Sequence, residues 1–404
     1  MSMNETPTAE RTHIGFFGLR NAGKSSLVNR ITNQEMSLVS EVKGTTTDPV
    51  RKSMELLPLG PVTIIDTPGY DDEGMLGEMR VRRMRETLAI CDIAVLVTEK
   101  DTLLAEEQEL LEKIREREIP YVIVRNKSDL ASETQAAGGP EGNSRPAVEG
   151  IVTVSALTGE GIEALKERIA HLAKDGTKQV RFVADLIGPG DTVVLVIPID
   201  SSAPKGRLIL PQQEAIRDIL DAGAVSVVTG VETLQESIGN LNRKPALVIT
   251  DSQAFAKVMK LVDNSIPLTS FSILMARYKG FLSEAVRGAY ALDSLKDGAR
   301  ILISEGCTHH RQCGDIGTVK LPAWIRKHTG IEPEFVFTSG HGFPEDLSGY
   351  DLIIHCGACM LNDKEVANRM KQAVREGVPF TNYGTAIAHM NGILQRSIRP
   401  IPDL

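Results

Sequence analysis

A phosphate-binding loop near the start of the chain constrains its fold more than any other feature. The loop is Gly18-Leu-Arg-Asn-Ala-Gly23-Lys24-Ser25, and it lies between the apolar run 13–17 and the helix-like run 26–31. Glycines in such a loop let backbone N–H groups turn toward phosphates, the lysine supplies a positive charge, and the serine hydroxyl can ligate Mg²⁺. A strand, a loop and a helix in this order predict a nucleoside triphosphate site.

Three more motifs of a nucleotide-binding sheet follow in order. The apolar run 62–65 leads to Asp66-Thr-Pro-Gly69, where the carboxylate can hold Mg²⁺ through water and the glycine N–H can meet a γ-phosphate. The run 121–124 leads to Asn126-Lys127-Ser-Asp129, whose last carboxylate can accept hydrogen bonds from guanine groups that adenine lacks. The run 151–154 leads into Ser155-Ala156, a loop suited to a backbone contact with the guanine oxygen. The predicted base is therefore guanine.

This arrangement resembles the GTPase superfamily and, more closely, its TrmE–Era-like branch. Two features carry the resemblance: the run Gly44-Thr45-Thr46-Thr47-Asp48, which is similar to the first switch of that branch, and Asn21 in the phosphate loop. The resemblance implies that Thr46 ligates Mg²⁺ and that Asn21 helps to hold a K⁺ ion, which supplies positive charge as an arginine finger does elsewhere. Tyr70 stands where Ras-like enzymes have a water-orienting glutamine, so we expect slow intrinsic hydrolysis.

The acidic residues after Tyr70 leave two interpretations open, because Asp71, Asp72 or Glu73 could position the water or lie in a solvated loop. We expect catalysis to depend on Lys24, Thr46, Asp66 and Gly69, with Mg²⁺ on Ser25 and Thr46. The residues expected to bind GTP or GDP are Gly18, Asn21, Ala22, Gly23, Lys24, Ser25, Ser26, Asn126, Lys127, Asp129, Ser155 and Ala156.

Length and charge limit what the rest of the chain can do. With 404 residues the chain is much longer than a GTPase domain needs, and domain-size statistics suggest about two to three domains. The net charge of −8 argues against a nucleic-acid partner that is held mainly through its phosphates. The first residues are polar without a signal-peptide core, and no apolar run approaches the roughly 18 residues of a membrane span. We therefore expect a cytoplasmic protein without a membrane partner.

Strand-like and helix-like runs alternate beyond residue 180. Apolar runs at 192–197, 225–228 and 246–249 are separated by helical runs, and the same rhythm returns at 300–303, 334–337 and 351–354. Such alternation predicts parallel sheets. The expected fold class is α/β with three domains: a P-loop GTPase fold (1–174) and two smaller parallel-sheet α/β domains (180–270 and 271–404). The middle domain has no nucleotide, metal or nucleophile motif, so we assign it to dimerisation.

The cysteines gather in the last predicted domain. Cys307-Thr-His309 follows one strand-like run and His355-Cys356-Gly-Ala-Cys359 follows another, so both sets are expected at the carboxyl ends of parallel strands. Two cysteines with this CxxC spacing can hold one metal or cluster. A structural zinc site and a redox pair remain alternatives, whereas a cytosolic location disfavours a disulfide. Cys91, between a helix and a strand, is expected to be a buried small apolar residue.

The GTPase motifs and the distal Cys-x-His and His-Cys-x-x-Cys motifs together resemble the HydF family over nearly the whole chain. This family consists of GTPases that assist assembly of the active-site cofactor of [FeFe]-hydrogenase. The resemblance implies a [4Fe–4S] cluster on Cys307, Cys356 and Cys359, in a cluster domain at 271–404. It also implies a scaffold or carrier for a two-iron cofactor precursor. The implied partners are two radical-SAM maturases, apo-[FeFe]-hydrogenase and further copies of the chain in a homodimer or larger oligomer.

The ligand of the fourth iron is left open by the sequence. His309 and His355 match the histidines of the motif, and Cys313 and Asp315 are near enough in sequence to reach the same centre. Two other functions remain as alternatives: a TrmE–Era-like GTPase that acts in RNA modification or ribosome assembly with a structural zinc site, and a redox enzyme that uses these cysteines directly. The acidic net charge opposes the first of them.

Overall fold

The computed structural model describes residues 11–32, 49–57, 59–70, 83–130, 150–175, 181–198, 208–306, 316–340, 342–402 and 404. The chain divides into two compact units, Met1–Lys178 and Gln179–Leu404. Several predicted site residues lie outside the described ranges: Thr46, Asp71, Asp72, Glu73, Cys307, His309, Cys313 and Asp315.

The first unit is built on a six-stranded sheet with the order β2-β3-β1-β4-β5-β6. Strand β2 runs antiparallel to β3, and all other neighbours run parallel. The strands are β1 (Thr12–Phe17), β2 (Val50–Leu56), β3 (Gly60–Asp66), β4 (Ile93–Thr98), β5 (Tyr121–Arg125) and β6 (Val152–Thr153), and the helices are α1 (Lys24–Thr32), α3 (Ala105–Glu116) and α5 (Ile162–Asp175).

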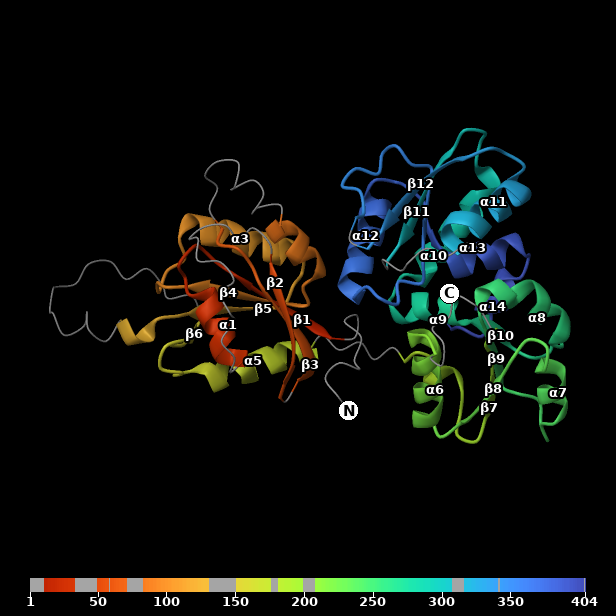
Figure 1. Ribbon diagram of the computed structural model, residues 1–404, viewed down its shortest axis with the longest axis horizontal. Coiled ribbons are helices and arrows are strands. Elements are labelled where there is room, and N and C mark those ends of the chain that lie inside the picture. The colour runs from red at the N-terminus through yellow and green to blue at the C-terminus, as the bar shows by residue number, and fades with distance from the viewer. Residues whose placement is uncertain are drawn as a thin grey trace. The chain divides into compact units, whose positions relative to one another are not determined.

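Helices cover both faces of this sheet, as Figure 1 shows for α3 on one face and α1 and α5 on the other. The central strand β4 is buried along its whole length. Its alternate side chains enter two cores: Val95 and Val97 pack with α1 and α5, while Ala94 and Leu96 pack with α3. A strand buried on both faces has a continuous apolar sequence, as these residues do.

The second unit contains two four-stranded parallel sheets, with the orders β10-β9-β7-β8 and β12-β11-β13-β14. The first comprises β7 (Thr192–Val196), β8 (Val225–Thr229), β9 (Leu247–Thr250) and β10 (Leu268–Ser270), with η2 (Ala184–Leu186), α6 (Leu210–Asp221), α7 (Leu234–Gly239), η3 (Ser252–Ala254), α8 (Phe255–Leu261) and α9 (Phe271–Tyr278). The second comprises β11 (Arg300–Glu305), β12 (Glu334–Ser339), β13 (Leu352–His355) and β14 (Phe380–Asn382), with α10 (Leu282–Tyr290), η4 (Ala291–Ser294), η5 (Ile316–Lys320), α11 (Leu321–Thr329), α12 (Asp363–Arg375), α13 (Tyr383–Met390) and α14 (Leu394–Ile398).

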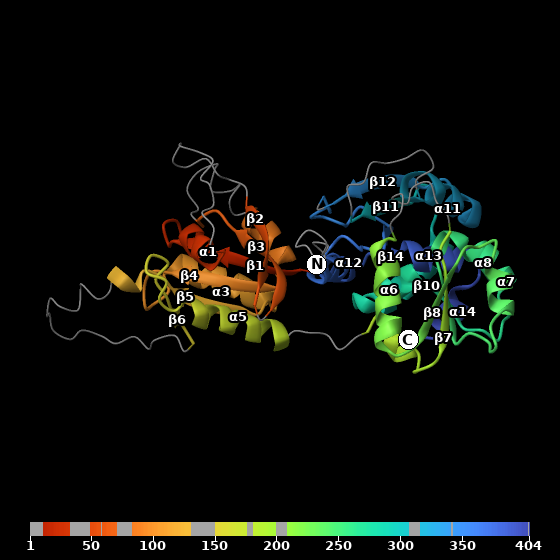
Figure 2. The ribbon, with the colours of Figure 1, turned by 60° about the horizontal axis from the view of Figure 1, so that its bottom comes forward.

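One continuous hydrophobic core joins the two sheets of the second unit, from Val193 on β7 to Ile354 on β13. Helix α13 lies between the two sets of strands in Figures 1 and 2 and contacts both α9 and β13. Helix α10 packs closely on β14 through Gly288, where an added Cβ would lie 2.2 Å from the carbonyl oxygen of Phe380. A larger residue there would push the helix off the sheet.

The predicted fold class is confirmed: a P-loop α/β sheet precedes two smaller parallel α/β sheets. All the strand-like runs named from the sequence form strands within two residues of their expected limits. Four strands are not among the named runs, namely the antiparallel β2, the buried β4, and the three-residue strands β10 and β14.

Candidate functional site

The phosphate loop joins the carboxyl end of β1 to the first residue of α1, which is Lys24. Gly18, Gly23 and Asn21 have positive φ values of 145°, 82° and 65°, and such values favour glycine and asparagine. Lys24 is buried, and its Nζ donates to the carbonyl oxygens of Gly18 at 3.0 Å and Leu19 at 2.8 Å. The lysine therefore lies across the loop, with the amino end of a helix beside it, as an anion site requires.

Ser25 and Asp66 meet at the amino end of α1, as the sequence motifs predict. Ser25 Oγ donates to Asp66 Oδ2 at 2.5 Å, while Asp66 Oδ1 is buried and has no hydrogen-bond partner among the described residues. Burial raises the pKa of Asp66, and the Ser25 hydrogen bond and the nearby Lys24 charge oppose that rise. A buried carboxylate oxygen with an unfilled acceptor position, beside a hydroxyl, is a donor set that suits hydrated Mg²⁺.

The Asp66–Gly69 segment lies directly against the phosphate loop. An added Cβ on Gly69 would lie 2.7 Å from Arg20 Cα, and the N–H of Tyr70 donates to the Gly18 carbonyl oxygen at 3.1 Å. The Tyr70 side chain is buried, and its hydroxyl accepts a hydrogen bond from Lys113 Nζ at 3.1 Å. Tyr70 therefore packs in the α3 core and does not replace the water-orienting glutamine of Ras-like enzymes.

Asn126 connects the predicted base-binding loops to the phosphate loop. Its Nδ2 donates to the Ala22 carbonyl oxygen at 3.1 Å, and its Oδ1 accepts from the N–H of Ala156 at 3.0 Å. Ser155 Oγ donates to Asp129 Oδ1 at 2.6 Å, which fixes the carboxylate predicted to read guanine. Lys127 adopts a positive φ of 64° and pairs with Glu99.

The structure thus brings together every described member of the predicted GTP set at the carboxyl ends of the parallel strands of one sheet, where open α/β sheets bind their ligands. Ser26 is exposed on the first turn of α1.

A second candidate site lies at the carboxyl ends of β11 and β13, where the two predicted thiol motifs begin. Cys356 Sγ accepts hydrogen bonds from the N–H of Gly306 at 3.0 Å and of Ala358 at 3.3 Å. Ala358 has a positive φ of 56°, which tightens the turn between Cys356 and Cys359. Gly306 immediately precedes Cys307, the third predicted thiolate. The backbone N–H that contacts the Cys356 sulfur therefore belongs to the residue just before Cys307.

Burial disfavours the thiolate form of both described thiols at the second site. Burial, together with the neighbouring Cys359 thiol, raises the pKa of Cys356 to about 11, and burial also raises the pKa of Cys359. Thiolates are the form that ligates iron or zinc, and a bound cation supplies the charge that removes their protons. Cys91, Cys356 and Cys359 are all free cysteines. Cys91 is fully buried with its sulfur bonded to the backbone, which confirms the prediction for it.

His355 is fully buried beneath the thiol site, and both of its ring nitrogens have hydrogen-bond partners. Nδ1 lies 3.0 Å from the Cys356 carbonyl oxygen, and Nε2 lies 3.0 Å from an Arg369 guanidinium nitrogen. Burial, and next the Arg369 charge, lower the pKa of His355 to about 3, so the ring is neutral. Arg369 donates in turn to Glu365 at 2.5 Å and to the Gly340 carbonyl oxygen at 2.6 Å.

The sequence motifs did not single out Arg369 or Glu365. Both are on α12, and only their shared i, i+4 spacing could have indicated that they form a pair.

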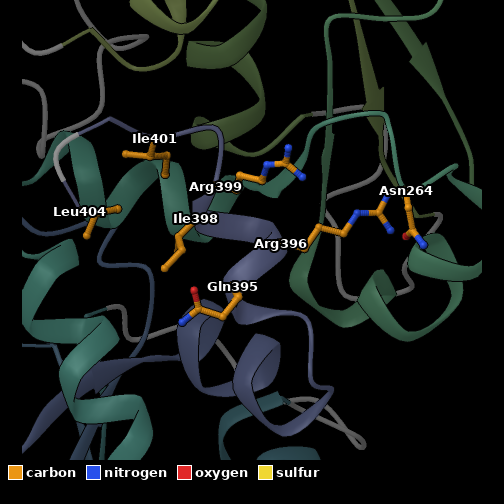
Figure 3. Close-up of a pocket in the computed structure, with 7 residues that line it drawn as sticks. All are labelled: Asn264, Gln395, Arg396, Ile398, Arg399, Ile401 and Leu404. Atoms are coloured by element: carbon orange, nitrogen blue, oxygen red, sulfur yellow. The ribbon is translucent and has the colours of Figure 1, made fainter.

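The second unit also has a hollow of about 620 Å³ beside α14 and the C-terminal residues. Arg396 projects at this hollow in Figure 3, and its guanidinium donates to the carbonyl oxygens of Val262, Asp263 and Ile266. Neither thiol nor imidazole side chains are among the described residues that line it, so it is separate from the thiol site. None of the described helices is both long and apolar enough to cross a membrane.

Family models match three parts of the chain. Residues 182–280 match a hydrogen maturase F dimerization domain, and residues 283–400 match a hydrogen maturase F tetramerization domain. Residues 13–127 match a model described as 50S ribosome-binding GTPase. The first unit is therefore a GTPase domain that binds GTP and Mg²⁺. The second unit contains a dimerization domain and a tetramerization domain, which indicates that the protein forms a homo-oligomer.

The chain is also similar to tRNA modification GTPases named MnmE. That of Chromobacterium violaceum is 33% identical over 165 residues, which is 40% of this chain and 35% of the relative. That of Clostridioides difficile is 31% identical over 165 residues, which is 40% of this chain and 34% of the relative. The chain thus matches only about a third of the length of these curated relatives.

Solved GTPase structures also match the chain. Era from Aquifex aeolicus bound to GDP and AlF₄⁻ is 19% identical, with a TM-score of 0.33, over 54% of this chain and 92% of that one. The G domain of the FeoB iron transporter of T. maritima is 23% identical, with a TM-score of 0.30, over 41% of this chain and 99% of that one.

Proposed function

Because this chain belongs to the hydrogen maturase F family, we propose that it is a GTP-hydrolysing scaffold or carrier with a [4Fe–4S] cluster. Its cargo is the two-iron precursor of the [FeFe]-hydrogenase cofactor, which it assembles or delivers. The partners in this proposal are two radical-SAM maturases, with which it works, and the apo-hydrogenase, which receives the cargo.

The observation that carries the cluster proposal is the hydrogen bond from the Gly306 N–H to Cys356 Sγ. This hydrogen bond holds Gly306, the residue before Cys307, against the CxxC turn. Cys307, Cys356 and Cys359, which follow two neighbouring strands, could therefore ligate the same cluster. Two N–H groups already point at the Cys356 sulfur, and such donors stabilise thiolate ligands and tune cluster potentials. When bound, the cluster would offer one iron with an exchangeable ligand to the incoming metal fragment.

We assign the three cluster thiolates to Cys307, Cys356 and Cys359. Among the candidates for the fourth iron, His355 is fully buried and would have to give up one of its two ring hydrogen bonds to bind, which favours a supporting role beneath the cluster. His309, Cys313 and Asp315 remain candidates for that position.

The GTPase domain supplies the switch in this proposal. Lys24 and Gly69 meet the β- and γ-phosphates, and Ser25, Thr46 and Asp66 hold Mg²⁺ directly or through water. Asn21 contributes to a K⁺ site. Loss of the third phosphate would then change the conformation around Thr46 and Gly69. A partner would respond because it binds the two conformations with different affinities.

The proposal is tested by replacing one thiolate in a maturation assay. Cys356→Ser should lose most of its iron and sulfide after anaerobic reconstitution, and it should fail to activate apo-hydrogenase when it is expressed beside both radical-SAM partners. The matched control is Cys91→Ser, because Cys91 is also buried and bonded to backbone but lies in the GTPase domain. Wild-type iron content and hydrogen evolution in Cys356→Ser would disprove the cluster assignment.

A further inference from the structure

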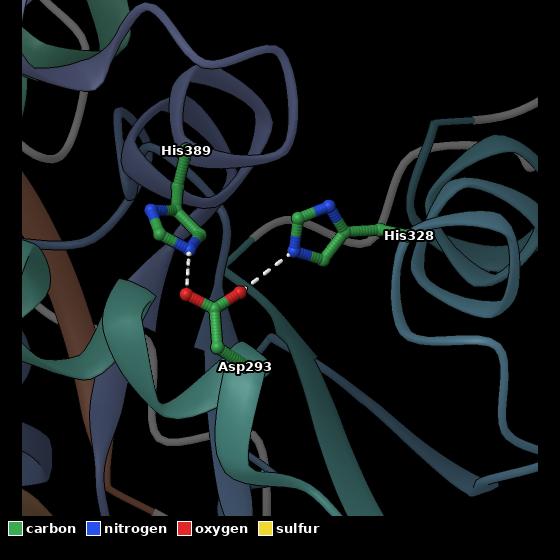
Figure 4. Close-up of side chains that lie close together, drawn as sticks. All are labelled: Asp293, His328 and His389. Carbon is green, nitrogen blue, oxygen red and sulfur yellow. Dashed lines mark hydrogen bonds and ion pairs between the residues drawn. The ribbon is translucent and has the colours of Figure 1, made fainter.

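Three side chains far apart in the sequence converge on the second unit, away from the cysteines. Asp293 belongs to η4, His328 to α11 and His389 to the last turn of α13. Figure 4 shows each imidazole ring pointing at a different oxygen of the Asp293 carboxylate. His328 Nε2 lies 2.9 Å from Oδ1 and His389 Nε2 lies 3.0 Å from Oδ2.

We propose that Asp293, His328 and His389 form a binding site for a divalent transition-metal ion of the Zn²⁺ or Fe²⁺ type. The three ligand atoms all lie within 4.8 Å of one another. Ligand bonds of about 2.0 to 2.2 Å place tetrahedral donors roughly 3.3 Å apart, so the two aspartate–histidine distances need to change by only a few tenths of an ångström. Two imidazoles and one carboxylate are a donor set that both ions accept.

The surroundings hold the donors in place and leave one side open. The His389 ring packs edge-on against Tyr290 at 4.9 Å and against His328 at 5.6 Å between centroids. His389 is 12% exposed, whereas Asp293 is 54% exposed, so water can reach the carboxylate side.

A cavity of about 490 Å³ adjoins the site between α11 and α13, and His328 is one of the residues that line it. Three protein ligands leave at least one coordination position for water or for a small molecule, as in open metal sites. A metal here would also connect η4, α11 and α13, and it would thereby stiffen the helices around the cavity. This site goes beyond the proposed function, because its ligands are neither thiolates nor part of the GTPase domain.

The test uses the full chain with its cluster already reconstituted, so that the thiolates are filled, and Zn²⁺ alone as the probe. We expect about one zinc per chain after gel filtration, with only nitrogen and oxygen neighbours in zinc-edge X-ray absorption. His328→Ala and His389→Ala should each weaken zinc binding roughly 100-fold, because even groups that merely support a metal ligand contribute about 10- to 100-fold. His171→Ala is the control, since His171 is an exposed histidine on α5.

Asp293→Asn provides a second readout that does not depend on a buried substitution. Zinc should raise the melting temperature of the wild-type chain, because a ligand that binds only the folded state stabilises it, and it should not raise that of Asp293→Asn. Sulfur neighbours around the zinc, or the same zinc affinity in both histidine variants as in His171→Ala, would overturn the proposal. Iron and sulfide content, measured on the same samples, reports separately on the cluster.

Discussion

The carboxylate of Asp129 is held in place before any base arrives. Ser155 Oγ donates to its Oδ1 at 2.6 Å, and Asn126 fixes the neighbouring loop through Ala156. One carboxylate oxygen therefore has a protein partner, and the other is available to the base. We therefore expect Asp129 to have the strongest influence on base choice among the residues of the loop.

We expect Asp129→Asn to lower GTP affinity by roughly 10- to 100-fold. The reason is that hydrogen bonds to a charged group are worth about 1.5 to 3 kcal/mol, and about 1.4 kcal/mol is tenfold. Equilibrium binding of GTP and ATP measures the change. Asp101→Asn is the control, because Asp101 is an exposed carboxylate of the same unit that pairs with Arg125. Unchanged discrimination between GTP and ATP in Asp129→Asn would contradict the assignment of the base motif.

Asn21 offers a test of the potassium prediction, since its φ of 65° is one that glycine also adopts readily. Wild-type GTP hydrolysis should be faster in potassium than in sodium at equal ionic strength. Asn21→Gly should keep the shape of the loop, lose the amide oxygen, and hydrolyse GTP at the same rate in both salts. If the wild-type rates do not differ between the two salts, the potassium site is wrong.

At the scale of elements, a buried ionic network fastens α12 beneath the thiol site. Arg369 and Glu365 on this helix are 5% and 8% exposed, and Arg369 also bonds to His355 on β13 and to the Gly340 carbonyl oxygen after β12. Breaking such a network leaves a buried charge without a partner, which costs more than the net value of the pair.

Arg369→Met should therefore destabilise the second unit by about 3 to 5 kcal/mol, because the buried Glu365 carboxylate loses the positive charge of Arg369. Urea unfolding followed by the fluorescence of Trp324 measures this, since the chain has one tryptophan and it lies on α11. Arg375→Met on the same helix is the control. Its side chain is 78% exposed, and we expect a change within about 0.5 kcal/mol. If both variants lower the free energy of unfolding by the same amount, the buried network does not contribute to stability as proposed.

Strong local signals explain which elements could be predicted. Continuous apolar runs such as 192–197, which forms β7, predict buried parallel strands, and the phosphate loop predicts both β1 and α1. By contrast β14 has only three residues, and β2 alternates exposed and partly buried residues at an edge. Tertiary pairing stabilises these strands, so their local sequence carries little signal.

The same contrast applies to the sites. Contiguous motifs predicted the residues that the structure assembles around Lys24 and beside Cys356. The Asp293, His328 and His389 cluster could not be predicted, because no spacing connects residues that only the packing of three elements brings together. His389, for example, lies on α13 and bonds to Asp293 on η4, nearly a hundred residues earlier in the chain.

At the scale of the whole molecule, the GTP motifs and the thiol motifs belong to separate compact units. The described ligands of either site come from one unit alone. GTP can therefore affect the unit with the thiol motifs only if the two nucleotide states differ in how strongly they bind that unit or a partner. In our account the nucleotide times loading or delivery of the cargo and takes no part in holding the cluster.

The most direct test of this account is the Lys24→Ala variant, measured for both iron content and hydrogenase activation. The lysine lies in the phosphate loop, so the variant should lose GTP hydrolysis. Lys166→Ala, which removes a lysine paired with Glu163 on α5, is the control. We predict that Lys24→Ala keeps its full iron and sulfide and yet yields no hydrogen evolution from apo-hydrogenase expressed with both radical-SAM partners. Full activation by a Lys24→Ala protein without GTPase activity would contradict a required nucleotide switch.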